Sequence, residues 1–223
     1  PRPAPRAPPA RPSDAWAAFR RRSAGYYAPL DGVAPTGRDV AAAAGHLPAA
    51  LVARVQTQAL DESLLTVSLR GYQAFRARFA LAQLRVVLGD EMGLGKTVQA
   101  VAVVAHLVAR GATHALVVCP ASVLENWVRE LRAHASLPVH AVHGEDREEA
   151  AAAWRAAGGV AVVTFAGLRR AGTEAFAAAA PAVRVVDEAH YVKNPLAKRS
   201  VAVAALARTT EHVLLLTGTP MEN

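Results

Sequence analysis

From residue 64 onward, short apolar segments alternate with longer stretches in which apolar positions recur at helical spacing. The apolar segments predict strands at residues 85–89, 114–119, 139–143, 160–165, 183–187 and 212–217. The remaining stretches predict helices at residues 72–84, 96–110, 122–135, 145–157, 167–179 and 195–208. Because the strands are apolar throughout and each is followed by a helix, the pattern predicts an α/β fold whose mainly parallel sheet is covered by helices on both faces.

Residues 1–63 lack this alternation. Residues 1–12, PRPAPRAPPARP, are proline-rich and of low complexity, and we interpret them as a disordered linker. Residues 13–63 predict a small helical segment of unknown role, with a capped helix at residues 13–22 and helical stretches at DVAAAAG and PAALVARVQTQAL. Since the chain begins with proline and stops without a finished element, we expect it to be a fragment of a longer protein.

The composition narrows the class of protein. The formal net charge is +7, but residues 1–40 alone carry seven arginines against three aspartates, so charge by itself leaves nucleic-acid contact open. The single cysteine, Cys119, excludes a disulfide framework and is expected to be a buried thiol at a strand end. No apolar run suggests a membrane span and no signal peptide opens the chain, which predicts a cytoplasmic protein without a membrane partner.

Three polar clusters follow predicted strands. They are residues 90–97 after the first strand, Asp187 and Glu188 at the end of the fifth, and Thr217-Gly218-Thr219 at the end of the sixth. In parallel sheets, ligands bind beyond the carboxyl ends of the strands. The sequence therefore predicts that the three clusters meet at one edge of the sheet.

The first cluster, DEMGLGKT, approximates the phosphate-binding pattern G-x-x-x-x-G-K-[ST], with Asp90 at the position of the first glycine. Gly93 and Gly95 allow successive backbone N–H groups to face an anion. Lys96 supplies a compact cation for phosphates, and Thr97 a hydroxyl for magnesium, at the start of the predicted helix 96–110. A glycine-rich turn with an incidental lysine is the alternative, although lysine occurs elsewhere only at positions 193 and 198.

The second cluster lies in VRVVDEAHYVKNP. Two neighbouring acids at the end of an apolar strand repel each other, which is unfavourable unless they have a role. We predict that Asp187 holds magnesium and that Glu188 orients or deprotonates an attacking water; two solvated acids are the alternative. His140 and His143, three apart on a predicted strand, point to opposite faces and are interpreted as surface or packing residues rather than as ligands of one metal.

In this order, DEMGLGKT, DEAH and TGTP resemble motifs I, II and III of superfamily-two helicases, whose motif I accepts a non-glycine residue at the position of Asp90. LRGYQ, VVCPASVLENWVREL, VVTFAGLRR, DEAHYVKNP and LLLTGTPMEN are similar to segments of one branch, the Swi/Snf-type DNA translocases. The resemblance covers residues 64–223 and implies a RecA-like P-loop domain, the first, ATP-binding lobe, which stops just after motif III.

The resemblance also implies roles for single residues. Lys96, Asp187 and Glu188 would be catalytic, and Thr97 and Asp187 would hold Mg²⁺. ATP would be bound by Gln73 on the adenine side and by Asp90, Glu91, Met92, Gly93, Leu94, Gly95, Lys96 and Thr97. His190, Thr217, Gly218 and Thr219 would couple the nucleotide to DNA-bound surfaces, and Ser122, Thr164, Lys193 and Asn194 would lie at the DNA backbone. Trp127 lies in such a segment too, but taken alone it is more often a core residue of an amphipathic helix.

The implied function is ATP hydrolysis coupled to movement along double-stranded DNA. The implied partners are that duplex, a second RecA-like lobe with an arginine finger beyond residue 223, and a transcription or repair assembly. A strand-separating DNA or RNA helicase and a non-hydrolysing nucleotide-binding scaffold or switch remain alternatives. Lys193-Asn194 after the acidic pair favours the translocase, whereas the presence of Lys96 and Glu188 argues against the scaffold.

Overall fold

The computed structural model describes residues 47–89 and 94–218, which all belong to one compact unit, Gly37–Asn223. The predicted linker at residues 1–12 and the helical stretches predicted at residues 13–22 and 39–45 lie outside the described residues. So do five of the candidate site residues, which are Asp90, Glu91, Met92, Gly93 and Thr219.

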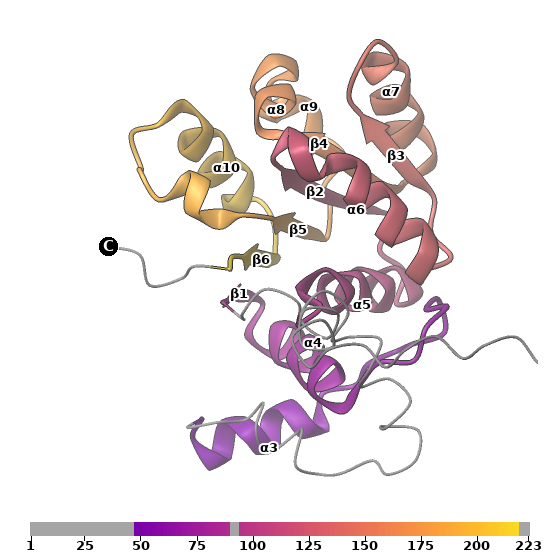
Figure 1. Ribbon diagram of the computed structural model, residues 1–223, viewed down its shortest axis with the longest axis vertical. Helices are drawn as coiled ribbons and strands as arrows, with labels where there is room; N and C mark the ends of the chain where they lie inside the picture. The colour runs from indigo at the N-terminus through magenta and orange to yellow at the C-terminus, as the bar shows by residue number, and fades with distance from the viewer. Residues whose placement is uncertain (1–46, 90–93, 219–223) are drawn as a thin grey trace, which may run out of the picture. The chain divides into compact units, whose positions relative to one another are not determined.

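The centre of the unit is a six-stranded sheet in which every pair of neighbouring strands is parallel. Its strands are β1 (Arg85–Leu88), β2 (His114–Cys119), β3 (Val139–Val142), β4 (Gly159–Thr164), β5 (Val183–Val186) and β6 (His212–Leu216). Their order across the sheet is β1-β6-β5-β2-β4-β3, so β1 and β3 are its edges (Figure 1). The predicted parallel sheet is confirmed, and each predicted strand matches an observed one to within one residue at either end.

The helices are α3 (Ala49–Thr57), α4 (Gly71–Gln83), α5 (Lys96–Ala109), α6 (Ala121–His134), α7 (Arg147–Ala157), α8 (Phe165–Ala171), α9 (Thr173–Ala177) and α10 (Lys198–Arg208), with a 3₁₀ turn η1 (Ala189–Val192). Two predictions were wrong in detail. The helix predicted at residues 167–179 is two helices, because Gly172 interrupts it with φ +82°. The helix predicted from residue 195 begins at Lys198, because the side chain of Asn194 accepts the N–H of Leu196 at 3.0 Å and forms a turn first.

Two apolar layers cover the sheet, one on each face. Helices α4, α5 and α6 pack in one cluster with alternate strand residues such as Val117 and Leu214. Helices α7 to α10 pack in the other with the intervening residues, such as Leu116 and Val118. The period-two alternation of a strand therefore supplies both layers from the same apolar run, which is why the strands read as apolar throughout.

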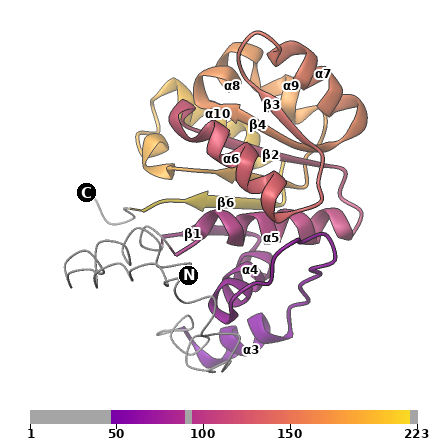
Figure 2. The same cartoon turned by 45° about the vertical axis from the view of Figure 1, so that its right-hand side comes forward.

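The segment before the sheet packs against two helices of the first layer, α4 and α5. Helix α3 lies beside α4 (Figures 1 and 2), and the Arg54 guanidinium donates a hydrogen bond to the Ala82 carbonyl at 3.0 Å. In the following connector, the backbone N–H of Asp61 donates to Nδ1 of the buried His106 on α5, at 2.8 Å. Within residues 47–89 and 94–218, none of the helices combines the length and apolar character that crossing a membrane requires.

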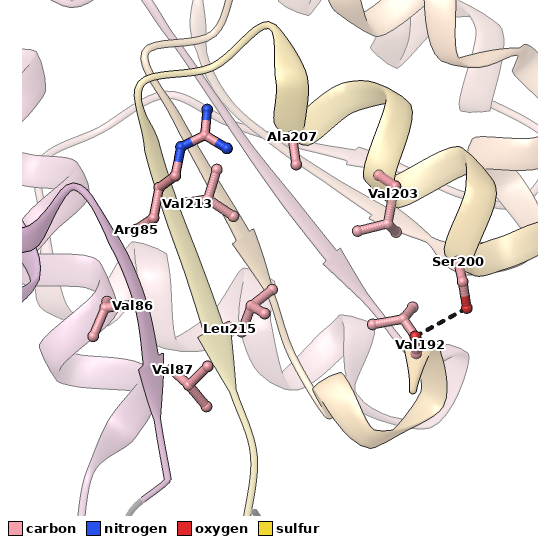
Figure 3. A pocket seen from close by; sticks show the side chains of 10 residues that line it. Arg85, Val86, Val87, Val192, Ser200, Val203, Ala207, Val213 and Leu215 are labelled. Atoms are coloured by element: carbon pink, nitrogen blue, oxygen red, sulfur yellow. Dashed lines mark hydrogen bonds between the residues drawn. The ribbon is translucent and has the colours of Figure 1, made fainter. Parts of the chain in front are cut away.

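A pocket of about 400 Å³ lies on the second face, beside edge strand β1 (Figure 3). Its wall is mostly apolar and comes from β1, β6, η1 and α10, with Ser200 donating a hydrogen bond to the Val192 carbonyl at 3.1 Å. None of the candidate site residues that the structure describes lines it. Val87 of β1 is 55% exposed at this pocket, so the helices of the second layer leave this edge of the sheet partly uncovered.

Candidate functional site

The sheet order brings the three polar clusters to neighbouring positions along one edge. Strand β6 lies between β1 and β5, and its ladder continues past the strand end, where the N–H of Thr217 donates to the Leu88 carbonyl at 3.1 Å. On the other side of β5, the N–H of Asp187 donates to the Val118 carbonyl of β2 at 2.9 Å. The start of α5, the acidic pair and Thr217-Gly218 thus follow the carboxyl ends of adjacent strands, as the sequence predicts.

The side chain of Gln73 packs closely against the backbone of Gly95. Gly95 precedes α5 in the left-handed region, with φ +72° and ψ +36°, and a Cβ at this position would lie 2.7 Å from Nε2 of Gln73. Gln73 is 9% exposed, and its Oε1 accepts the backbone N–H of Arg70 at 3.0 Å in a capping box at the start of α4. The amide nitrogen of Gln73 is therefore the end that faces the glycine loop.

The start of α5 is held by side chains that bind the loop backbone rather than by a side-chain cap on the helix. Among the described residues, no side chain caps this helix. The Leu94 carbonyl accepts the Tyr72 hydroxyl at 3.2 Å and the Gln99 side-chain amide at 3.3 Å, which ties the end of the loop to α4 and α5. Lys96 and Thr97 are the first two residues of α5, so they stand where the N–H groups of a helix are open to an anion.

Asp187 is held through both carboxylate oxygens. Oδ2 accepts the indole N–H of Trp127 at 2.7 Å, and Oδ1 accepts the backbone N–H of Glu188 at 2.8 Å. Trp127 itself is 1% exposed within the first apolar layer. Sequence reasoning treated Trp127 as a core residue or a DNA neighbour, and the sequence carries no signal that would pair it with Asp187, 60 positions away.

Glu188 adopts a backbone conformation unusual for its residue type. It has φ +50° and ψ +53°, and its backbone carbonyl accepts the N–H of Tyr191 at 2.9 Å, which begins the 3₁₀ turn. Its carboxylate lies 3.1 Å from Nδ1 of His190. A non-glycine residue in the left-handed region is strained, and such strain is found preferentially at functional sites.

The turn after the acids is anchored by aromatic contacts. The Tyr191 ring stacks on Phe165 at the start of α8, with ring centroids 5.9 Å apart and planes inclined by 12°. Arg199 of α10 lies over the same ring, 5.5 Å from its centroid, and donates a hydrogen bond to the Tyr191 carbonyl. The acidic turn is thereby linked to the segment that follows β4.

The four residues expected near a DNA backbone have different surroundings. Ser122, in the first turn of α6, and Lys193 and Asn194, after η1, are exposed. Thr164 is only 4% exposed, and its hydroxyl accepts the N–H of Gly167 at 2.9 Å as the cap of α8. The hydroxyl of Thr164 therefore has a structural role as a helix cap.

Two further sequence interpretations meet the structure here. Cys119 at the end of β2 is fully buried, as expected, and burial, with a smaller contribution from Asp187, raises the pKa of its thiol to about 12. Across the described part of the chain, no group of three or more His, Cys, Asp and Glu side chains is arranged to hold a metal ion by itself.

A parallel sheet with a glycine-lysine loop after one strand and an acidic pair two strands away defines a RecA-like domain. The chain belongs to the SNF2-related domain family, whose model matches residues 53–223. This match begins within α3, which lies before the predicted lobe boundary at residue 64.

Individual relatives agree with this family. A Bacillus subtilis (strain 168) protein, YwqA, whose name suggests an ATP-dependent helicase/translocase, is 36% identical over 166 residues, 70% of this chain and 18% of its own. The mouse Chromodomain-helicase-DNA-binding protein 1-like is 33% identical over 191 residues, 81% of this chain and 21% of its own. The solved Sulfolobus solfataricus SWI2/SNF2 ATPase core, in complex with double-stranded DNA, matches with a TM-score of 0.63 and 33% identity, over 74% of this chain and 35% of that one. The chain thus spans about a third or less of each of these relatives.

Proposed function

We propose that this chain is the ATP-binding lobe of a motor that couples ATP hydrolysis to movement along double-stranded DNA. The observation that carries the proposal is the order β1-β6-β5, which sets the Lys96 loop, Thr217 and the pair Asp187-Glu188 side by side at one sheet edge. Family membership and the duplex bound to the Sulfolobus ATPase core support the choice of duplex DNA as the partner.

The loop fits a nucleotide. With no side chain at Gly95 and no cap on α5 from any described side chain, the first N–H groups of the helix can approach phosphates closely, and Lys96 adds a compact charge beside them. The Oε1 of Gln73 accepts the backbone N–H of Arg70, and its amide nitrogen faces Gly95. In this proposal that nitrogen contacts adenine. Asp90, Glu91, Met92, Gly93 and Leu94 complete the loop in this proposal.

The oxygen donors fit magnesium. This ion keeps several waters and is held in proteins by one or two carboxylates together with substrate phosphates, so Asp187 and the hydroxyl of Thr97 suffice as protein groups. Bound Mg²⁺ would neutralise charge on the phosphates. Glu188 orients the attacking water and takes its proton, while Lys96 stabilises the charge that develops on the transferred phosphoryl group.

The residues next to Asp187 and Glu188 suit a role in coupling the nucleotide state to DNA binding. His190 contacts the Glu188 carboxylate, and Thr217 continues from β6 beside β1, the strand that precedes the loop. Thr219 belongs to this coupling segment in the proposal. In the proposal these residues transmit the state of the nucleotide to the DNA-facing surface, where Ser122, Lys193 and Asn194 meet the phosphate backbone. The other partners would be a second RecA-like lobe and a transcription or repair complex, in the cytoplasm.

The test is the DNA dependence of ATP hydrolysis by the complete protein. Turnover should rise with duplex DNA more than with the same mass of single-stranded DNA, and Lys96→Ala should remove it. Stronger stimulation by single strands would favour a strand-separating helicase. ATP binding without turnover under any DNA condition would favour a scaffold and refute the motor.

A further inference from the structure

The hydrogen bond between Trp127 and Asp187 joins two segments that the sheet places next to each other. Strand β2 ends at Cys119 and leads into α6, while β5 pairs with β2 and ends one residue before Asp187. The apolar side of α6, which includes Leu124, Val128 and Leu131, packs in the first layer and fixes the helix against the sheet. Trp127 lies on this side, so packing fixes the position of its indole ring.

A buried indole N–H needs an acceptor, but it does not need a carboxylate. Trp154 shows the ordinary solution in this fold. It is 0% exposed, and its N–H donates to the backbone carbonyl of Gly159 at 3.1 Å. Trp127 is almost as buried, yet its N–H donates to the carboxylate of Asp187, a side chain that has two rotatable bonds of its own.

The two donors to Asp187 are complementary. The Glu188 N–H holds Oδ1 from the same strand end, and the Trp127 N–H holds Oδ2 from another helix, so the carboxylate plane is defined from both sides. Hydrogen bonds to an ionised acceptor are shorter and stronger than neutral ones, which agrees with the 2.7 Å separation of Trp127 Nε1 and Asp187 Oδ2. Groups that orient a metal-holding carboxylate in this way tune the affinity for the metal.

We propose that Trp127 is a positioning residue for the magnesium site, and that it fixes the carboxylate of Asp187 in the orientation that accepts Mg²⁺. This inference rests on the proposed nucleotide site. Because Trp127 is part of α6, the hydrogen bond also links the carboxylate to the position of this helix, whose first turn contains Ser122.

The test measures the affinity of the complete protein for a fluorescent ADP analogue, with Mg²⁺ and with EDTA. Wild-type protein should bind the analogue more tightly with Mg²⁺. Trp127→Phe, which keeps an aromatic ring but lacks the N–H, should reduce this Mg²⁺-dependent gain about tenfold and leave the affinity in EDTA unchanged. Raising the Mg²⁺ concentration about tenfold should restore the tighter binding.

Trp154→Phe is the matched control, because it removes an equally buried indole N–H bond from the other apolar layer. It should retain the wild-type gain from Mg²⁺. Should Trp127→Phe fold poorly, replacement of Trp127 alone by 3-benzothienylalanine keeps the shape of the indole, substitutes sulfur for its N–H, and should give the same loss.

The outcomes separate the two proposals. A wild-type protein whose nucleotide affinity is the same with Mg²⁺ and with EDTA would overturn the proposed Mg²⁺–nucleotide site, and this inference with it. A wild-type gain that persists in the benzothienyl protein would overturn the positioning role alone. An equal loss of affinity with Mg²⁺ and with EDTA would also overturn it, since a purely structural role has that effect.

Discussion

Replacing Gly95 by alanine should lower the free energy of unfolding in two ways. The first is conformational, because a residue with a Cβ at φ +72° loses roughly 1–2 kcal/mol. The second is the contact of the new Cβ with Nε2 of Gln73, 2.7 Å away. The end of a glutamine side chain can move, so the direct steric cost is small. Its movement, however, breaks the hydrogen bond from the Arg70 N–H to Oε1, which contributes about 0.5–1.5 kcal/mol.

Gly144→Ala is the matched control. Gly144 has φ +74°, and a Cβ there would meet nothing within 4 Å, so this variant carries the conformational cost alone. In urea unfolding of the 223-residue chain followed by tryptophan fluorescence, Gly95→Ala should lose about 1 kcal/mol more free energy of unfolding than Gly144→Ala. In a Gln73→Ala background the difference should disappear.

The same variant tests the adenine side of the site. If Gln73 recognises adenine, Gly95→Ala should lower the ratio of ATP to GTP affinity, whereas Gly144→Ala should not. This ratio cancels any effect on phosphate binding. Equal losses of stability in the two glycine variants, unaffected by Gln73→Ala, would refute the contact on which the reasoning depends.

Three further predictions concern other residues. Lys96→Ala should reduce steady-state ATP turnover of the complete protein below a tenth of wild type, because the developing charge loses its compact cation; higher residual turnover contradicts this role. Glu188→Gln should still bind ATP but hydrolyse it slowly, since the amide keeps the shape without accepting a proton, and single-turnover assays should find the nucleotide trapped. Burial lowers the pKa of His106 from its ordinary value of 6.5, so the unfolded state takes up protons first as pH falls. In urea unfolding, the free energy of unfolding should therefore be highest above pH 6.5 and decline below it. The decline should be smaller in His106→Gln. Some decline should remain in this variant, because burial also lowers the pKa of His212.

The strands could be predicted because each is a short run of apolar residues bounded by polar or turn-forming ones. The order of the strands could not be predicted from these runs, since β6 enters between β1 and β5 more than 120 positions after β1. The errors arose where local chemistry overrode helical periodicity. Gly172 interrupts an apolar stretch that would suit one helix, and Asn194 forms a turn before α10.

Some features of the candidate site could likewise be predicted from the sequence, and others could not. The positions of Lys96, Thr97 and the acidic pair at one sheet edge could be predicted because each follows a recognisable strand. Their roles with phosphate and magnesium stay predictions from residue type and spacing. The contacts of Trp127 with Asp187 and of Tyr191 with Phe165 depend on which strands and helices pack together, and no periodicity encodes them. The capping use of Thr164 was missed because a threonine at a strand end is equally suited to cap the next helix or to face a ligand.

The adjacent acids at the end of β5 raised a physical difficulty, because two neighbouring carboxylates repel each other. The structure resolves it by giving each one separate partners. Asp187 accepts N–H groups from Trp127 and the backbone, whereas Glu188, turned by its left-handed backbone, lies against His190. A residue in a regular extended conformation at position 188 would not begin the turn that brings His190 to this carboxylate. The strain at Glu188 therefore accompanies a division of contacts, in which Asp187 is held by two N–H donors and Glu188 is paired with the imidazole of His190.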